Sequence, residues 1–246
     1  MDEGRLDVAA ADGIATVLIN NPAKRNAMTA AMWLALPPLL DRLAADPAVK
    51  VVILAGAGGT FCAGADINDA AAIGREGEGS VAVRAEEALA RFPKPTIARV
   101  EGFCVGGGCQ LAVACDLRFA GEGSQFGVTP AKLGVVYPAV TTRRLVRLVG
   151  PGAAKYLLFS GKLITVERAA SIGLVDEIAT SHDVQIFAQS LTRNSQLTIA
   201  AAKDIIDAED DSRVAYWRSQ AQQSSDLDEG IAAFRERRAP TFSWRP

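Results

Sequence analysis

A run of glycines at the start of an apolar helix is the clearest chemical signal in this sequence. Gly106, Gly107 and Gly108 follow a β-rich segment and lead directly into apolar residues that end near Cys115. Free N–H groups at a helix N-terminus, at the positive end of the helix dipole, suit a phosphate or a developing oxyanion. The same glycines could instead allow close backbone packing, so the sequence leaves both interpretations open.

A second glycine-rich turn, between Leu54 and Ile67, follows another predicted strand. A dinucleotide-binding turn would have a glycine where Phe61 stands, and the run at 106–108 lacks the Lys and Ser or Thr of a nucleotide-binding P-loop. His182 is the single histidine. A histidine-rich zinc site is therefore excluded, and a Ser/His/Asp triad would have to use that one residue. We expect no metal site, and we expect His182 at the surface near a helix start.

The composition is that of a folded protein with balanced charge. The chain has 246 residues, 49% of them hydrophobic, and a formal net charge of -2. This excludes a disordered chain and argues against a nucleic-acid-binding surface. No apolar run approaches the roughly 18–20 residues that span a bilayer, and residues 1–11 do not resemble a signal peptide. The cysteines form no CxxC pair. We expect buried reduced thiols, a cytoplasmic location and no membrane partner.

Predicted strands alternate with helical stretches in the first half of the chain, and these elements must position the two turns. The predicted strands are Ile14–Asn20, Val51–Ala55, Thr96–Val100 and Leu117–Ala120. A helix is predicted over Thr29–Ala45, with a kink or break at Pro37 and Pro38. Gly74–Ser80 is predicted to be a surface loop. The second half is predicted to be helical and without strands, with helices at Thr141–Val149, Gly152–Phe159, Val166–Ile172, Val184–Arg193, Leu197–Ala208, Ser212–Gln223 and Asp228–Arg237.

Together these segments resemble the crotonase superfamily, also called the enoyl-CoA hydratase/isomerase family. The matching motifs, in order, are Asn21–Met28, Phe61–Ile67, Phe92–Pro95, Val100–Gly108 and Asp228–Phe242. The resemblance covers essentially the whole chain. It implies an α/β fold, the crotonase-like ββα spiral with a C-terminal helical region. It assigns residues 1–190 to the spiral core and 191–246 to a trimerisation region continuous with it, and it implies a homotrimer or a hexamer made of two trimers.

The resemblance also implies an acyl-CoA thioester substrate in fatty acid metabolism. By residue-to-residue match, the backbone N–H groups of Ala65 and Gly107 form an oxyanion hole for an enolate. Such donors offset charge that appears only in the transition state. Coenzyme A is part of the substrate, so no separate cofactor is expected. The residues expected to contact coenzyme A are Lys24, Arg25, Ala27, Ala63, Asp66, Ile67, Phe234 and Arg237.

The chain departs from the hydratases of this family at two positions. Those hydratases use two glutamates to position and activate water, and the matching positions here are Gln110 and Pro130. A glutamine is no general base near neutral pH, and proline has no side-chain proton to give. The resemblance therefore predicts an atypical lyase, hydratase-like or a decarboxylase, ranked above an isomerase.

Three alternatives stay open at this point. The stretch Thr129–Tyr137 is similar to the TPxxLGxxY element of the family's short-chain acyl-CoA decarboxylases, in which a tyrosine at the place of Tyr137 lies near the departing carboxylate. Those relatives tend to have histidine where this chain has Ala65. An isomerase would need a carboxylate elsewhere, and Glu86 or Glu87 could supply it. A non-catalytic acyl-CoA-binding protein would also fit the loss of both glutamates.

Overall fold

A six-stranded sheet runs through the molecule, and the glycine-rich turn between Leu54 and Ile67 follows one of its strands. The computed structural model describes residues 4–69, 77–208 and 211–245. The strand order is β1-β2-β3-β4-β6-β9, and β1 is antiparallel to β2 while the other neighbours are parallel. The strands are β1 (Arg5–Ala11), β2 (Ile14–Asn20), β3 (Val51–Gly56), β4 (Thr96–Val100), β6 (Leu117–Ala120) and β9 (Glu177–Ile178).

A smaller sheet consists of β5 (Phe103–Val105), β7 (Gln125–Gly127) and β8 (Ile164–Thr165). Its strand β5 ends just before the glycine-rich helix begins at Gly107. The prediction that the second half has no strands was wrong, because β7, β8 and β9 all follow Ala120. Each has two or three residues. Such short strands carry no readable alternation of polar and apolar residues, which is why the sequence pattern missed them.

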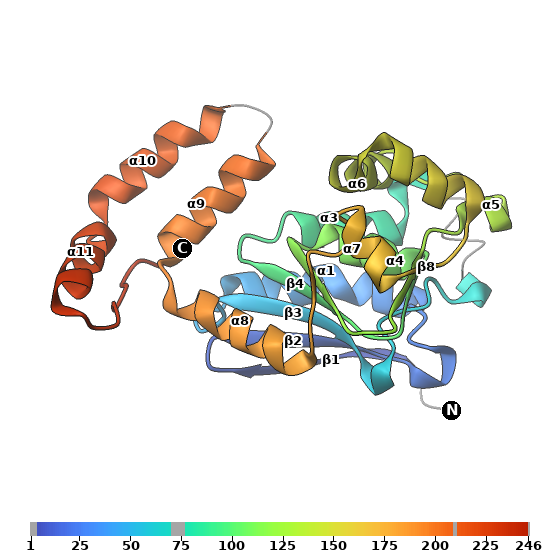
Figure 1. Ribbon diagram of the computed structural model, residues 1–246, viewed down its shortest axis with the longest axis horizontal. Coiled ribbons are helices and arrows are strands. Elements are labelled where there is room, and N and C mark those ends of the chain that lie inside the picture. Colours follow the sequence, from blue (N-terminus) through green and yellow to red (C-terminus); the bar gives the residue numbers. More distant parts are fainter. Residues whose placement is uncertain (1–3, 70–76, 209–210, 246) are drawn as a thin grey trace.

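Helices cover both faces of the large sheet (Figure 1). Val51, Ile53 and Ala55 pack with residues of α8, whereas Val52 and Leu54 belong to the cluster formed with α1, α3 and α4. Alternate residues of a strand point to opposite faces, so an uninterrupted apolar run is buried on both sides. The helices are α1 (Ala30–Ala45), α3 (Val81–Ala90), α4 (Gly107–Ala114), α5 (Pro130–Leu133), α6 (Ala139–Ser160), α7 (Val166–Ser171), α8 (Ser181–Arg193), α9 (Gln196–Asp207), α10 (Val214–Gln223) and α11 (Asp226–Glu236).

Two predictions about helix interruptions had different outcomes. The predicted interruption at Pro37 and Pro38 is not a break, since α1 continues across both prolines to Ala45. Buried leucines on both sides of the prolines anchor the helix, namely Leu36, Leu39, Leu40 and Leu43. In α6 the two predicted helical segments do meet at an interruption, because Gly150 has φ 73° and ψ 164°. Residues 74–76 of the predicted loop Gly74–Ser80 lie outside the described residues, and Gly77–Gly79 form a 3-10 turn.

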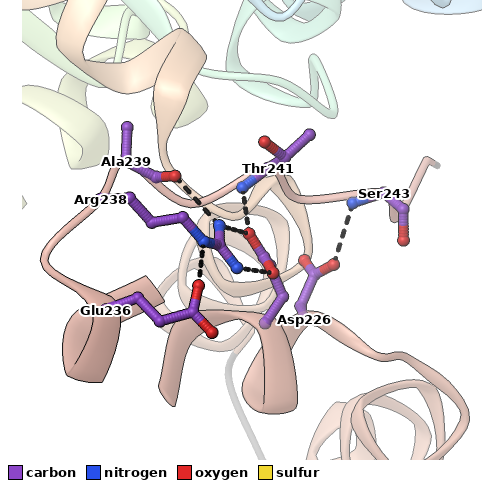
Figure 2. Close-up of polar contacts among 7 residues, drawn as sticks. Asp226, Glu236, Arg238, Ala239, Thr241 and Ser243 are labelled. Carbon is purple, nitrogen blue, oxygen red and sulfur yellow. Dashed lines mark hydrogen bonds and ion pairs between the residues drawn. The ribbon is translucent and has the colours of Figure 1, made fainter. Parts of the chain in front are cut away.

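The C-terminal helices α9, α10 and α11 extend away from the sheet (Figure 1). Their large apolar side chains are unusually open, with Phe234 87%, Ile206 79% and Leu227 71% exposed. Hydrogen bonds fasten the last residues onto α11, and Figure 2 shows the Arg238 side chain at the centre of this contact. Its guanidinium donates to both carboxylate oxygens of Glu229, at 2.6 and 2.9 Å. In the described part of the chain, no helix is long and apolar enough to cross a membrane.

Candidate active site

Ala65 stands in an extended segment whose orientation is fixed by Met28. The Met28 amide donates to the carbonyl of Gly64, and the Asp66 amide donates to the carbonyl of Met28, both at 2.8 Å. Successive N–H groups of an extended chain point to opposite sides. Since the bonding groups of Gly64 and Asp66 face Met28, the Ala65 N–H faces the other way, toward the start of α4.

Gly107 is the first residue of α4, and a different structural constraint favours glycine at each of the positions 106, 107 and 108. Gly106 has φ 55° and ψ -121°, a conformation that residues with a Cβ avoid. A Cβ on Gly107 would lie 3.0 Å from the Trp33 ring, so a side chain here would press on that indole. A Cβ on Gly108 would lie 2.3 Å from the Cys62 carbonyl oxygen, which leaves no space for any side chain. The glycine run therefore serves close backbone approach as well as exposing N–H groups.

The two predicted oxyanion donors lie next to each other. A Cβ added to Gly107 would be 3.4 Å from the Ala65 nitrogen, and one added to Gly64 would be 3.5 Å from the Gly107 nitrogen. As the first residue of its helix, Gly107 has no intrahelical acceptor for its N–H. Within the described residues, neither N–H donates to another backbone group. Two free donors at one helix N-terminus form a site suited to an oxygen that gains negative charge.

A cavity of about 130 Å³ opens in front of these donors. Its walls include seven of the residues predicted for the site, which are Ala63, Ala65, Ile67, Gly107, Gln110, Pro130 and Tyr137. Apolar side chains that the sequence analysis did not assign to the site complete the wall, among them Trp33, Val83, Leu133 and Val136. The cavity is therefore largely apolar around a pair of polar donors, as small-molecule sites commonly are.

Gln110 and Pro130, where the resemblance implies the two glutamates of the hydratases, both line this cavity. Gln110 is on α4, one turn after Gly107, and its side chain makes no hydrogen bond to the other described residues. Pro130 is the first residue of α5, where its fixed φ favours helix initiation. Neither residue carries a group that titrates near neutral pH.

Tyr137 lies in the cavity wall close to Gly106. Its hydroxyl would be 3.8 Å from a Cβ added to Gly106. Burial raises the Tyr137 pKa above its usual value, and the neighbouring Cys109 and Glu86 raise it further. At neutral pH the phenol is therefore protonated and can donate a hydrogen bond or a proton to a bound substrate.

Lys24 and Arg25 form the basic edge of the same region. The Lys24 ammonium contacts the Asp66 carboxylate at 2.5 Å, and this hydrogen bond holds the Asp66 pKa below its usual value. The Lys24 side chain is 50% exposed, so it remains open to an anionic ligand. The Arg25 guanidinium stacks over the Phe103 ring at 5.3 Å, and the Arg25 carbonyl accepts from the Ala63 amide.

The remaining predicted contacts for coenzyme A are not gathered around the cavity. Ala27 is buried, and its carbonyl accepts a hydrogen bond from the Asn21 side chain. Phe234 and Arg237 lie on or just after α11, far from α4 and α5 in this chain (Figure 1). Both are exposed. The Asp66 carboxylate accepts a hydrogen bond from the Asn68 amide and so caps the following turn. His182 is exposed at the start of α8, which confirms the prediction for that residue.

Two residues important for the geometry were not assigned to the site from sequence. Asn26 donates to the carbonyls of Ala57 and Thr60, so it ties the N-terminal loop to the first glycine-rich turn. Its position in the motif shared with the crotonases was the only signal. Trp33 is 1% exposed, and its indole N–H has no partner among the described residues. An apolar helix position gave no indication that it would contact the second oxyanion donor.

Comparisons with known proteins agree with this geometry. The sequence matches the family model described as enoyl-CoA hydratase/isomerase over residues 9–245. A crystal structure of an enoyl-CoA hydratase/isomerase family member is 41% identical, with a TM-score of 0.94 over 99% of this chain and 100% of that one. A putative enoyl-CoA hydratase from Thermus thermophilus is 35% identical over 93% of this chain and 97% of the relative. The 2,3-dehydroadipyl-CoA hydratase of Escherichia coli is 33% identical over 92% of this chain and 94% of the relative.

Proposed function

The chain belongs to the enoyl-CoA hydratase/isomerase family, and on that premise we propose that it is an enzyme acting on an acyl-CoA thioester through an enolate. The predicted crotonase-like α/β fold with helical C-terminus is confirmed by the structural match. One observation carries the proposal: the free N–H groups of Ala65 and Gly107 face one apolar cavity. Loss of one such donor typically raises a reaction barrier by about 3–4 kcal/mol.

In this proposal, the ability to hold a thioester oxygen does not depend on the two glutamates of the hydratases. The two N–H groups can stabilise a thioester oxygen as it becomes an enolate oxygen, and those groups belong to the backbone. Gln110 and Pro130 instead remove the usual means of activating water. We therefore propose an atypical lyase, without the two-glutamate hydration of crotonyl-CoA.

The first experiment incubates the purified protein with crotonyl-CoA and with methylmalonyl-CoA and follows thioester absorbance and product mass. Hydration of crotonyl-CoA at an ordinary enzymatic rate would contradict the argument from Gln110 and Pro130. Binding of acyl-CoA by calorimetry, without turnover of any tested thioester, would instead identify a non-catalytic binding protein and sink the enzyme proposal.

A second candidate function is short-chain acyl-CoA decarboxylation, favoured by the position of Tyr137. Its protonated hydroxyl lies beside Gly106 and lines the cavity. Decarboxylation needs an oxyanion hole and a proton donor, but no pair of glutamates. Tyr137→Phe is expected to reduce decarboxylation of methylmalonyl-CoA by about 100-fold, the lower end for a general acid. The matched control is Tyr156→Phe on the exposed side of α6, and equal rates for all three proteins would remove Tyr137 from the reaction.

The basic edge is proposed to bind the phosphates of coenzyme A. Lys24→Gln is expected to weaken binding of a CoA thioester a few-fold, about 1 kcal/mol for a half-exposed charge. The control is Lys155→Gln on exposed α6. The difference between these two variants should diminish at high salt, because screening weakens exposed charge pairs. An equal affinity for both variants would reassign Lys24 to holding Asp66 alone.

The open apolar side chains of α9, α10 and α11 support a homotrimer or hexamer, through which Phe234 and Arg237 would reach a neighbouring subunit's coenzyme A. Exposed apolar patches of this kind mark association surfaces. Light scattering on the purified protein measures the mass. A Phe234→Asp variant should shift it toward the 25.8 kDa of one chain. A monomeric wild type would contradict the assembly. We propose a cytoplasmic location for this assembly.

A further inference from the structure

Glu86 is a buried carboxylate beside the acyl cavity that the oxyanion chemistry above does not use. It lies on α3 with Val83 and Leu89 on the buried face and is 2% exposed. An apolar residue at such a position is often as stable as a buried ion pair, or more stable. Stability alone is therefore a weak reason for a carboxylate here.

A small second cavity connects Glu86 with the site. It has about 10 Å³ and is lined by Glu86, Cys109, Gln110, Tyr137 and Thr141, among others. Gln110 and Tyr137 also line the larger acyl cavity, so these two side chains form a shared wall. The volume is close to the minimum of roughly 10–15 Å³ that one water molecule needs, and the wall offers it several polar partners.

The groups around Glu86 hold its carboxylate in one orientation. The Thr141 hydroxyl donates to Oε2 at 2.5 Å, and the Arg144 guanidinium donates to Oε1. Arg144 also contacts Glu87, which is only half-buried, so the network runs from the small cavity to the protein surface.

We propose that Glu86 is the group with which the substrate α carbon exchanges its proton, through one water in the small cavity and the Tyr137 hydroxyl. This inference rests on the proposed enolate chemistry. When the α C–H bond breaks, its electron pair moves into the thioester enolate. The proton goes to the Tyr137 oxygen while the Tyr137 proton moves to the water and a water proton moves to the Glu86 carboxylate. The negative charge passes from Glu86 to the enolate oxygen, which Ala65 and Gly107 hold.

Glu86 acts through Tyr137 and is thus a positioning residue in this scheme. Enolate formation needs its ionised form, so the rate should fall as the pH drops through the Glu86 pKa. Burial raises that pKa, Thr141 and Arg144 lower it, and Glu87 raises it. The other titratable group facing the small cavity, besides Tyr137, is Cys109. The acidic limb of the pH profile should accordingly lie above that of an ordinary glutamate.

The test is hydrogen–deuterium exchange at the α carbon of butyryl-CoA in D₂O, followed by mass spectrometry from acid to neutral pH. Glu86→Gln should slow exchange by about tenfold or more, since general acid–base groups contribute roughly 100- to 10,000-fold. KM should stay unchanged and the acidic limb should disappear. Glu87→Gln is the matched control, because it loses the other contact of Arg144 but does not line the small cavity. It should retain the wild-type exchange rate at neutral pH, while its acidic limb moves to lower pH because Glu87 no longer raises the Glu86 pKa.

A second variant keeps the proposal falsifiable if Glu86→Gln folds poorly. Thr141→Val removes a hydrogen bond that stabilises the ionised carboxylate, so it should move the acidic limb to higher pH. An unmoved limb in Thr141→Val, wild-type exchange by Glu86→Gln, or equal loss in Glu87→Gln would each overturn the relay and leave the enolate proposal standing. Wild-type protein that binds butyryl-CoA but exchanges no proton would overturn the enolate proposal together with the relay.

Discussion

Replacing Gly106 by alanine isolates the contribution of backbone conformation to this site. Gly106 has φ 55° and ψ -121°, outside the regions that residues with a Cβ adopt readily. The added methyl group would itself have space, since its nearest neighbour, Thr129 Oγ1, would lie at 3.7 Å. The perturbation is therefore conformational, not steric.

The expected magnitude follows from the peptide unit that joins Gly106 to Gly107. Its orientation depends on ψ of Gly106, and it carries one oxyanion donor. An alanine held in this conformation costs about 1–3 kcal/mol of the free energy of unfolding. Relaxation of that strain turns the Gly107 N–H away from the substrate oxygen. Loss of the donor then lowers kcat/KM by about 100- to 1000-fold.

The assay combines chemical denaturation with kcat/KM for the thioester that the wild type converts fastest. Gly150→Ala is the control, because Gly150 has φ 73° and ψ 164°, has nothing within 4 Å of an added Cβ, and lies in α6 away from the cavity. Both variants should lose stability, and only Gly106→Ala should lose catalytic efficiency. Wild-type kcat/KM in Gly106→Ala, or an equal loss in both, would refute the reasoning.

Three further predictions concern hydrogen bonds and packing away from the two N–H donors. Asn26→Ala should lower the free energy of unfolding by about 1–3 kcal/mol in urea, because it leaves two backbone carbonyls without their donor; no change would contradict this. Phe126→Ala, at a fully buried position, should cost about 3–5 kcal/mol in the same assay. Arg238 and the Thr241 amide lower the Glu229 pKa to about 2 from its usual 4.5. The Glu229 contacts therefore contribute stability above pH 4.5, and this contribution disappears as the pH falls toward 2. Trp244 fluorescence should report release of the C-terminal segment in this pH range. An unchanged signal would refute the prediction.

The sequence predicted those strands of the large sheet whose own residues form a recognisable apolar or alternating pattern. Strands β2, β3, β4 and β6 were found because each is a continuous apolar or alternating run. Strand β1 was missed because most of its residues are exposed and it is defined by pairing with β2. The small sheet was missed because its pairs, such as Phe126 with Ile164, join segments far apart along the chain.

The motifs of the candidate site could be predicted from the sequence, but the spatial arrangement of their N–H groups and side chains could not. The glycines could be read directly from the residues, whereas the expectation of glutamates at positions 110 and 130 came from the resemblance to the hydratases. Which N–H groups face the cavity depends on hydrogen bonds between Met28 and the segment around Ala65, and these have no local signal. Likewise, Glu86 and Glu87 are equivalent in sequence, yet Glu86 is buried beside the cavity and Glu87 is only partly buried. Only the packing of α3 against α4 and α6 separates them.

The supports of the oxyanion donors and the side chains that would do chemistry are physically independent here. Backbone bonds from Met28 and β5 hold the donor segments, and none of them involves the side chain of Gln110 or Pro130. Residues at positions 110 and 130 can therefore change without disturbing the Ala65 and Gly107 N–H groups. A chain can thus keep the family's fold and these two N–H groups while the side chains at positions 110 and 130 change. For this protein the reaction must be sought in the groups that remain around the cavity, Tyr137 first among them.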